Sequence, residues 1–233
     1  MVKAGKPVPG RSGRPRAGEE RLSRLTILEA ALRIVDTEGL DAMTMRRLAS
    51  TLGVNPMSIY HHLPNKAAVF AGLAELVFSQ LESTPPDDSV PWQDELKAAA
   101  AAYRDALRAH PNLALQVLSD TSAVSDVVVV TVEPFYRALD RAGAEPRQIV
   151  EAVNTIIDFI HGFSLGEAAV RNDTFDLAPD LLTRVSNLPP GKAPTLTRVV
   201  TELGADGLAY DFNTGFATGI ALLVDGIASR YAL

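Results

Sequence analysis

Two short helical segments joined by a single turn constrain the fold of this chain more than any other feature. Thr44 caps the first segment, which ends at Leu52, and Gly53 closes it. The second covers Met57 to His62, after an Asn55-Pro56 pair in which asparagine is a good N-cap and proline suits the first helical position. Because the turn between such helices needs a residue that tolerates positive φ, this spacing predicts a helix-turn-helix.

Helical periodicity on both sides extends this pair to a small domain. Apolar residues recur three and four positions apart within 22–39, and a longer helix is expected over 65–81. Ile59 and Leu63 lie on the face opposite the polar residues of the second short helix, so we expect them in the core. Residues 21–68 are therefore predicted to form a three-helix domain.

Charge is divided unevenly along the chain. Residues 1–66 hold 11 lysines and arginines against 6 acidic residues, a charge of +5, whereas residues 67–233 carry −11. Residues 1–20 are rich in Gly, Pro, Lys and Arg and have no apolar face, which predicts a flexible basic arm. A basic head on an acidic body suggests that the head binds a polyanion.

Several classes of protein are excluded by composition. The chain has no cysteine, so it contains no disulfide, no thiolate metal site and no cysteine nucleophile. Its longest apolar stretch, residues 215–224, is far shorter than the roughly 20 residues that a membrane-spanning helix needs. The basic first residues lack the apolar segment of a signal peptide. We therefore expect a cytoplasmic protein that does not contact a membrane.

Residues 69–233 are predicted to form a helical bundle. Helices are expected over 92–109, 113–118, 133–142, 146–170 and 209–232. The run Val127–Val130 favours a strand, but no partner strand is evident nearby, so we interpret it as a helix with a kink or restart at Pro134. Several prolines interrupt 172–207, where we expect a partly ordered loop. The fold class is therefore all-α.

Short motifs stand in a characteristic order in the head and continue into the body. They are Leu25–Ala31 up to Gly39, Thr44–Ala49, Leu52-Gly53-Val54, Ser58–Leu63, Asn65-Lys66 and, further on, Ala109–Leu113. This order resembles the tetracycline repressor (TetR) family of transcription factors, with its tetracycline-repressor-type C-terminal domain. The resemblance implies a helix-turn-helix DNA-binding domain over 21–68 and a ligand-binding and dimerisation domain over 69–233.

The resemblance also implies a function. The chain is expected to be a homodimeric, ligand-responsive repressor that binds a pseudo-palindromic operator in double-stranded DNA and is released by a small-molecule effector. A transcriptional activator, or a regulator that needs a corepressor, would carry the same head and stays an alternative.

Residues at the helix starts of the head are the candidates for DNA contact, since the second helix of such a motif lies in the major groove. Arg46 suits a guanine or a phosphate and Met57 a thymine methyl, while Thr44 serves as a cap and a contact. Lys66 opens a helix whose N-terminal dipole favours a phosphate. The remaining candidates are Asn55 and Ser58 on the leading edge, and Tyr60, His61 and His62, which by similarity to the family contact sugar and phosphate. For Arg14 and Arg16 two alternatives stay open: entry into the minor groove, or non-specific attraction to DNA.

The body is expected to hold the effector in a cavity of each protomer, as the family implies. Polar residues on otherwise apolar helices, with two phenylalanine walls, are the candidates. They are His110, Asn112, Gln116, Phe135, Asn154, Asp158 and Phe159. We expect no cofactor and no metal; His61 and His62, as adjacent helical residues, point about 100° apart and cannot chelate one ion.

Two pairs of glycines suggest how the chain dimerises. Gly162 with Gly166, and Gly215 with Gly219, each form a step of small residues four positions apart, which allows helices to approach closely. We therefore expect the helices over 146–170 and 209–232 to pair across a two-fold axis.

Two sequence features suggest other functions. Gly162–Gly166 also fits G-x-S-x-G, the pattern of a hydrolase nucleophile elbow, after a strand-like Thr155–Ile160. Such an enzyme needs an acid and a histidine after the serine, and the last histidine is His161, so we expect no enzyme. A helical adaptor that uses its basic head to bind an acidic protein is the other alternative.

Overall fold

A computed structural model describes residues 22–81, 89–113, 126–169, 174–176, 178–189 and 191–233. The expected basic arm over 1–20, with Arg14 and Arg16, lies outside the described residues. So do Gln116 and the helix expected over 113–118, apart from Leu113.

The head is built from helices α1 (Arg24–Glu38), α2 (Met45–Leu52) and α3 (Pro56–Tyr60), and α4 (Lys66–Phe78) continues from it into the 3₁₀ turn η1 (Ser79–Leu81). Side-chain oxygens cap all four α-helices, because the first N–H groups of a helix have no partner within it. The capping residues are Ser23, Thr44, Asn55 and Asn65. Apolar residues from the four helices, with Ile59 and Leu63 among them as expected, form one buried core.

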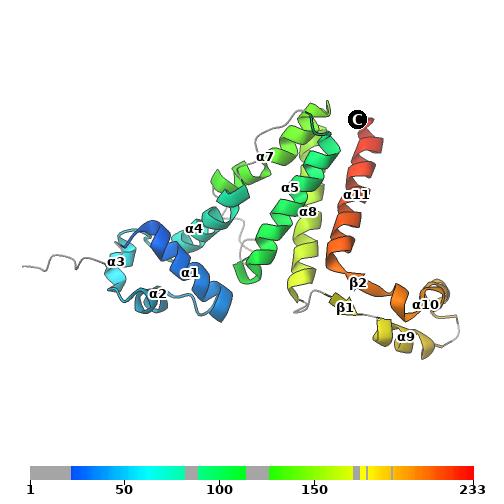
Figure 1. Cartoon of the computed structure of the whole chain (residues 1–233), viewed down its shortest axis with the longest axis horizontal. Coiled ribbons are helices and arrows are strands. Elements are labelled where there is room, and N and C mark those ends of the chain that lie inside the picture. The colour runs from blue at the N-terminus through cyan, green and yellow to red at the C-terminus, as the bar shows by residue number, and fades with distance from the viewer. Residues whose placement is uncertain (1–21, 82–88, 114–125, 170–173, 177, 190) are drawn as a thin grey trace, which may run out of the picture.

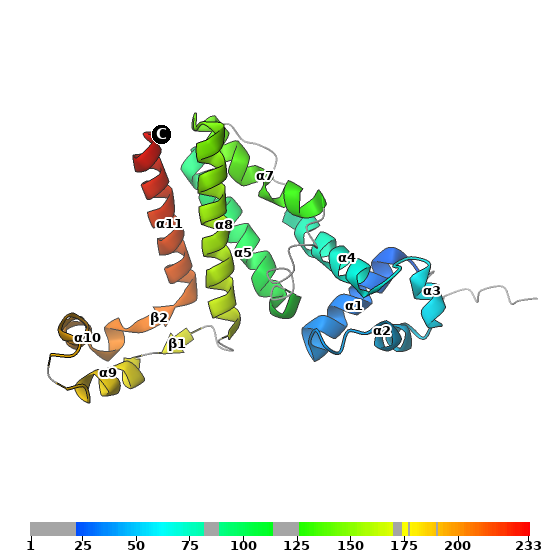
Figure 2. The ribbon, with the colours of Figure 1, turned by 180° about the vertical axis from the view of Figure 1, so that it is seen from behind.

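The body is a helical bundle of α5 (Trp92–Ala109), α7 (Asp126–Arg141), α8 (Pro146–Ala169) and α11 (Phe212–Tyr231). Helices α5, α8 and α11 lie side by side, and α4 connects them with the head at one end of the molecule (Figures 1 and 2). A second core, with Leu96, Phe135 and Ile156 fully buried, fills the space between these helices. The predicted all-α class is confirmed, with two small strands added.

The valine run belongs to a helix, as expected, but the restart at Pro134 was wrong. Helix α7 runs from Asp126 to Arg141 with Pro134 inside it. Its neighbour Phe135 is buried in the body core, and packing of this kind stabilises a helix across a proline that costs it one hydrogen bond.

The partly ordered loop expected over 172–207 was also wrong, because the described residues of this range contain ordered elements. Strand β1 (Thr174–Asp176) pairs antiparallel with β2 (Ala209–Asp211), with Thr174 opposite Asp211. Between them α9 (Ala178–Ser186) and α10 (Pro194–Gly207) pack on each other. We call 174–211 the arm, as distinct from the basic arm expected over 1–20. It projects from the body at the end remote from the head (Figure 1).

The last helix therefore starts three residues later than expected. Ala209–Asp211 is strand, and the Asp211 carboxylate accepts hydrogen bonds from the backbone N–H groups of Asn213 and Thr214, which caps α11. A hydrogen bond from the Thr214 side chain, together with these backbone bonds, lowers the pKa of Asp211.

Helix α8 is the one described helix with the length and mean hydropathy of a membrane span. It packs against α5, α7 and α11 in the bundle, and the core helix of a soluble protein meets the same criteria.

A buried ion pair joins three helices of the body. The Arg104 guanidinium of α5 donates two hydrogen bonds to the Glu167 carboxylate of α8, over 2.7 and 2.9 Å, and a third over 3.1 Å to Asn213 of α11. The two charged side chains are only 6% and 12% exposed. The guanidinium also lies 4.8 Å from the centre of the Phe216 ring. This site fixes α5 relative to both other helices.

Removing Glu167 is expected to destabilise the protein strongly, because Arg104 would keep a buried charge without its main partner. We expect Glu167→Ala to lower the free energy of unfolding by about 3–5 kcal/mol. Glu202→Ala breaks the exposed Arg198–Glu202 pair, 61% exposed on both sides, and is the matched control, with a loss below about 1 kcal/mol. Urea unfolding at one fixed protein concentration compares them, and equal losses would contradict the assignment.

Candidate nucleic-acid interface and effector groove

The turn between α2 and α3 has the geometry of a helix-turn-helix. Gly53 adopts φ +65° and ψ 27°, the left-handed conformation that glycine adopts without the steric cost of a side chain. The Val54 N–H donates to the Ala49 carbonyl over 3.1 Å and that of Gly53 to Ser50 over 3.3 Å, which closes α2 before α3 begins. The predicted role of Gly53 in the turn is confirmed.

The predicted DNA contacts lie at the surface of the head. Met57 is 62% and Tyr60 40% exposed, so Tyr60 is not a core residue, while Ile59 between them is fully buried. Ser58 is half-buried. The exposed candidates are Thr44, Arg46, Asn55, Met57, Tyr60, His61, His62 and Lys66.

Helix α3 differs in extent from the expected Met57–His62. It starts at Pro56 and ends at Tyr60, so His61 and His62 lie in the turn that follows, where His62 N–H donates to the carbonyl of Ile59 over 2.9 Å. Pro64 two residues on cannot continue a helix, which is why the helix ends early. Across the described part of the chain, no group of three His, Asp or Glu side chains is placed to hold a metal ion.

Two candidates have a capping role. The Thr44 hydroxyl oxygen accepts from Arg47 N–H over 3.1 Å, and the Asn55 amide oxygen accepts from Met57 N–H over 2.9 Å. The side-chain NH₂ of Asn55 remains available to donate, since the cap uses only its oxygen.

The two arginines of α2 differ in their surroundings. Arg47 donates to both carboxylate oxygens of Glu38, over 2.6 and 3.0 Å, and to the hydroxyl of Thr51. Its hydrogen bonds lower the pKa of Glu38 and tie α2 to the end of α1. Arg46 is exposed, and no hydrogen bond or ion pair holds it to any described residue. Arg46 is therefore the arginine that is free to bind an external anion or base.

Lys66 keeps its positive charge at the surface. Its ammonium nitrogen lies 5.3 Å from the centre of the Phe70 ring, one turn along α4. As the first residue of α4, it adds its charge to the positive end of the helix dipole, and a phosphate is favoured there.

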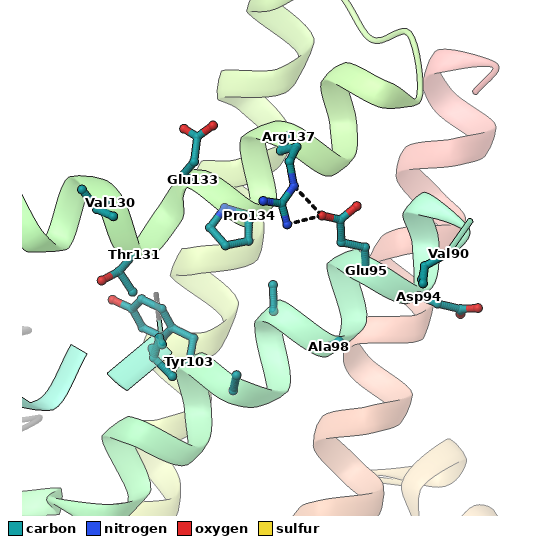
Figure 3. A pocket seen from close by; sticks show the side chains of 13 residues that line it. Val90, Asp94, Glu95, Ala98, Tyr103, Val130, Thr131, Glu133, Pro134 and Arg137 are labelled. Atoms are coloured by element: carbon teal, nitrogen blue, oxygen red, sulfur yellow. Dashed lines mark hydrogen bonds and ion pairs between the residues drawn. The ribbon is translucent and has the colours of Figure 1, made fainter. Parts of the chain in front are cut away.

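The body contains a groove between α5 and α7, with a cavity of about 320 Å³ (Figure 3). Its walls are mostly apolar, with three alanines on α5 facing Val130 and Pro134 of α7. The lining residues are Leu81, Val90, Asp94, Glu95, Ala98, Ala99, Ala102, Tyr103, Val130, Thr131, Glu133, Pro134 and Arg137.

Charged side chains from both walls are among the lining residues. Glu95 accepts hydrogen bonds from Arg137, at 2.7 Å from its Nε, and from Arg141, at 2.5 Å (Figure 3 shows the first pair). Asp94 and Glu133 are exposed at the rim. Glu95 thus pairs with both arginines, and the Lys97 ammonium lies 3.5 Å from Asp94, so Glu133 is the lining carboxylate that has no ion pair among the described residues.

Tyr103 is a buried polar group of the lining. Its hydroxyl lies 3.1 Å from Nε2 of His161 on α8. Burial raises the pKa of Tyr103 to about 12 and lowers the pKa of His161, although Asp158 opposes the second shift. At neutral pH the tyrosine therefore keeps its proton and the histidine is neutral, so this bond joins two uncharged groups.

None of the expected ligand residues that the structure describes lines this groove, and two of them bind the head instead. His110 contacts the carboxylate of Asp36, and Asn112 donates to the Val35 carbonyl at the end of α1. A polar residue on an apolar helix predicts that its side chain is buried against a hydrogen-bonding partner. It does not show whether that partner is a ligand in a cavity or a residue of another domain.

The other expected ligand residues are in the core or on the surface. Phe135 is buried between helices, and Phe159 packs on Phe163 and Phe216, with ring centres 5.7 and 5.8 Å away. Asn154 and Asp158 are exposed on α8. Sequence reasoning missed the α5 face of the groove, although the run Ala98–Ala102 was a signal, because small side chains leave space beside a helix.

The four glycines fall into two different settings. Gly162 and Gly166 are exposed on α8, with open space where a Cβ would stand. A Cβ on Gly215 would clash with Tyr210, and one on Gly219 with Phe159, both of the same chain. Gly215 and Gly219 therefore allow close packing within the chain, and the expected interface alone does not account for them.

The G-x-S-x-G segment does not form a nucleophile elbow. It lies wholly inside α8, and the residues before it, expected to resemble a strand, are helical. Ser164 is 7% exposed, and its hydroxyl has no hydrogen-bond partner among the described residues. A buried helical serine lacks the strand-turn-helix geometry that exposes a nucleophile.

Two family models match the chain. "Bacterial regulatory proteins, tetR family" covers residues 27–73, and "Tetracyclin repressor-like, C-terminal domain" covers residues 84–231. The boundary between the two matches lies near η1, and the first match contains the whole helix-turn-helix.

Relatives match over nearly the whole chain. The class A tetracycline repressor protein from transposon 1721 of Escherichia coli is 30% identical over 90% of this chain and 92% of its own length. The class C tetracycline repressor protein of Escherichia coli is 29% identical over 89% and 91%. The structure of Mycobacterium smegmatis BioQ superposes with a TM-score of 0.66 at 28% identity, over 90% of this chain and 99% of BioQ, which has also been solved with its double-stranded DNA operator. The chain therefore belongs to the TetR family of bacterial regulatory proteins.

Proposed function

We propose that this protein is a repressor that binds a pseudo-palindromic operator as a homodimer and releases it when an effector occupies the groove between α5 and α7. The observation that carries the proposal is the exposed face of the helix-turn-helix, where Arg46 stands without a partner among the described residues. Relatives named as repressors, and BioQ with its operator, support the same function.

In this proposal α3 enters the major groove, and Met57 and Tyr60 contact base edges and the sugar-phosphate backbone. Arg46 binds a guanine or phosphate through its planar fork, and Lys66 with the start of α4 binds a phosphate. The effector acts by binding more tightly to the conformation that does not fit the operator, because equal affinity for both conformations would shift nothing.

Selection of bound duplexes from a random DNA pool tests the DNA-binding function, and Arg46→Ala tests the contact. We expect an inverted repeat for the natural protein, and for Arg46→Ala a loss of about 1–3 kcal/mol in binding with relaxed preference at one position. The control is Arg147→Ala, whose side chain is 90% exposed on the body. An Arg46→Ala protein that selects the same repeat with unchanged affinity would show that the contact is wrongly assigned.

We infer that the outer faces of α8 and α11 form the dimer interface. Large apolar side chains are exposed on both helices, with Val150 45%, Leu165 39% and Leu222 68% exposed. Gly162 and Gly166 leave a flat strip beside them on α8. A partner helix can approach such a strip closely, and burying these side chains removes apolar surface from water.

The two glycine settings predict opposite effects of a bulky residue. Gly166→Leu is expected to shift dimer to monomer in sedimentation without loss of helical content, since its Cβ meets nothing within the chain. Gly219→Leu is expected to lower thermal stability instead, because it displaces Phe159. Ala101→Leu, on the exposed side of α5, is the control. A Gly166→Leu protein that sediments as a full dimer would rule out this interface.

The groove favours an effector that is apolar and carries no negative charge. Its walls are alanine, valine and proline side chains, which stabilise apolar surface by burial. Glu133 repels an anion, whereas Asp94 is paired with Lys97 and Arg137 with Glu95. Tyr103 provides one hydroxyl that stays protonated. The proposed effector class is therefore neutral or cationic amphipathic compounds.

Dyes of opposite charge test this class. We expect crystal violet, a cation, to bind about tenfold more tightly than the anion anilinonaphthalene sulfonate, a difference of about 1.4 kcal/mol. The double substitution Asp94→Asn with Glu133→Gln should remove the preference, whereas Asp105→Asn, exposed on α5 outside the groove, should keep it. Tetracycline with magnesium is titrated in parallel, because relatives carry its name. Preference for the anion would contradict the proposed class.

A further inference from the structure

The chain segment after α5 is docked on the head. Leu113 is 2% exposed and belongs to the head core together with Val35 of α1. Ala106, nearly two turns before it, also packs on this core. A short stretch of the body sequence thus completes the core of the DNA-binding domain.

Two polar contacts fix the same segment to the end of α1. The Asn112 side-chain NH₂ donates over 2.9 Å to the Val35 carbonyl, which also accepts from the Gly39 N–H over 3.0 Å at the end of the helix. Nδ1 of His110 lies 3.0 and 3.1 Å from the two carboxylate oxygens of Asp36; because an ionised carboxylate only accepts, the histidine N–H donates. Both side chains reach α1 from the C-terminal end of α5.

The end of α1 is in turn bound to α2. Glu38, two residues after Asp36, holds Arg47 through two hydrogen bonds. Arg47 is the neighbour of Arg46, the proposed DNA contact. A continuous series of contacts therefore connects the end of α5, through α1, with Arg47 beside the proposed DNA contact.

Two attachments join the head to the body among the described elements, besides the contact of Ala106 with the head core. One is α4, which packs on both α1 and α7; the other is the segment 110–113 (Figure 2 shows α4 bridging head and body). A body attached by one helix can rotate about it, whereas a second attachment away from that axis fixes the orientation. Helix α5 is also a wall of the effector groove.

We propose that His110 and Asn112 are positioning residues that lock the head to the body and thereby set the spacing of the half-sites that the dimer accepts. This inference rests on the proposed operator-binding function. A dimer reads two half-sites at a separation that its geometry fixes. If the lock is removed, each head still binds its half-site, but the separation of the two heads is no longer fixed.

The test measures the preference for spacing, using the full-length dimer and the operator found by selection. Affinity is compared for that operator, for versions with one base pair inserted or deleted at the centre, and for a duplex with one half-site. We expect the natural protein to discriminate against the altered spacings by about tenfold or more. The double substitution His110→Ala with Asn112→Ala should reduce this ratio to about threefold or less and leave half-site affinity unchanged.

A second variant keeps the size of the side chain. Asn112→Asp cannot donate to the Val35 carbonyl and places a carboxylate against it, so it should lose spacing preference as well. Asn187→Ala, exposed on the arm, is the matched control and should keep it. Circular dichroism verifies that each variant is folded.

The outcomes separate the two proposals. If the folded natural protein binds no half-site, the proposed function fails. If the natural protein binds and discriminates, and both lock variants are folded and keep its spacing ratio, the role of His110 and Asn112 is refuted. A merely structural role would lower the melting temperature of the variants without changing the spacing ratio.

Discussion

The arrangement of the body depends on one buried ion pair, Arg104 with Glu167. A charged pair taken out of water is stable only where its geometry is good and its other hydrogen bonds are satisfied, and here Asn213 and two aromatic rings complete the guanidinium's surroundings. These partners come from α8 and α11 while Arg104 belongs to α5, so the pair allows one relative position of the three helices. The residue before it, Tyr103, is thereby held in the groove wall and against His161. The α5 wall of the groove and the position of α8 are fixed by the same few contacts.

The head was predicted well because its signals are local. Thr44, Asn55 and Gly53 each determine the backbone within a few residues, and their caps and turn were confirmed. The arm could not be predicted in this way. Its strands have three residues each, and β1 is ordered only through pairing with β2, more than thirty residues away in the sequence. Short elements that depend on such distant partners leave no periodic pattern, whereas prolines in their connections suggest a loop.

The expected effector residues show a second limit of sequence reasoning. His110 and Asn112 are polar residues at the end of an apolar helix, and they do have specific partners, but the partners belong to α1. The groove is instead shaped by alanines, whose side chains have no polar group that would mark them in the sequence as ligand-binding residues. One element, α5, thus carries both the wall of the groove and, at its end, the contact to the head. Its two ends connect the site where an effector is proposed to bind with the domain that is proposed to bind DNA.

The β1–β2 pairing determines where the chain tolerates an insertion. Because Thr174 lies opposite Asp211, the two ends of the arm are held together where it leaves the bundle. Helices α9 and α10 pack mainly on each other, so the bundle's helices do not depend on the length of what lies between the strands. A segment closed in this manner can be lengthened at a small entropic cost, which grows only with the logarithm of its length. The arm is therefore the place where a reporter domain can be inserted without disturbing α8 and α11.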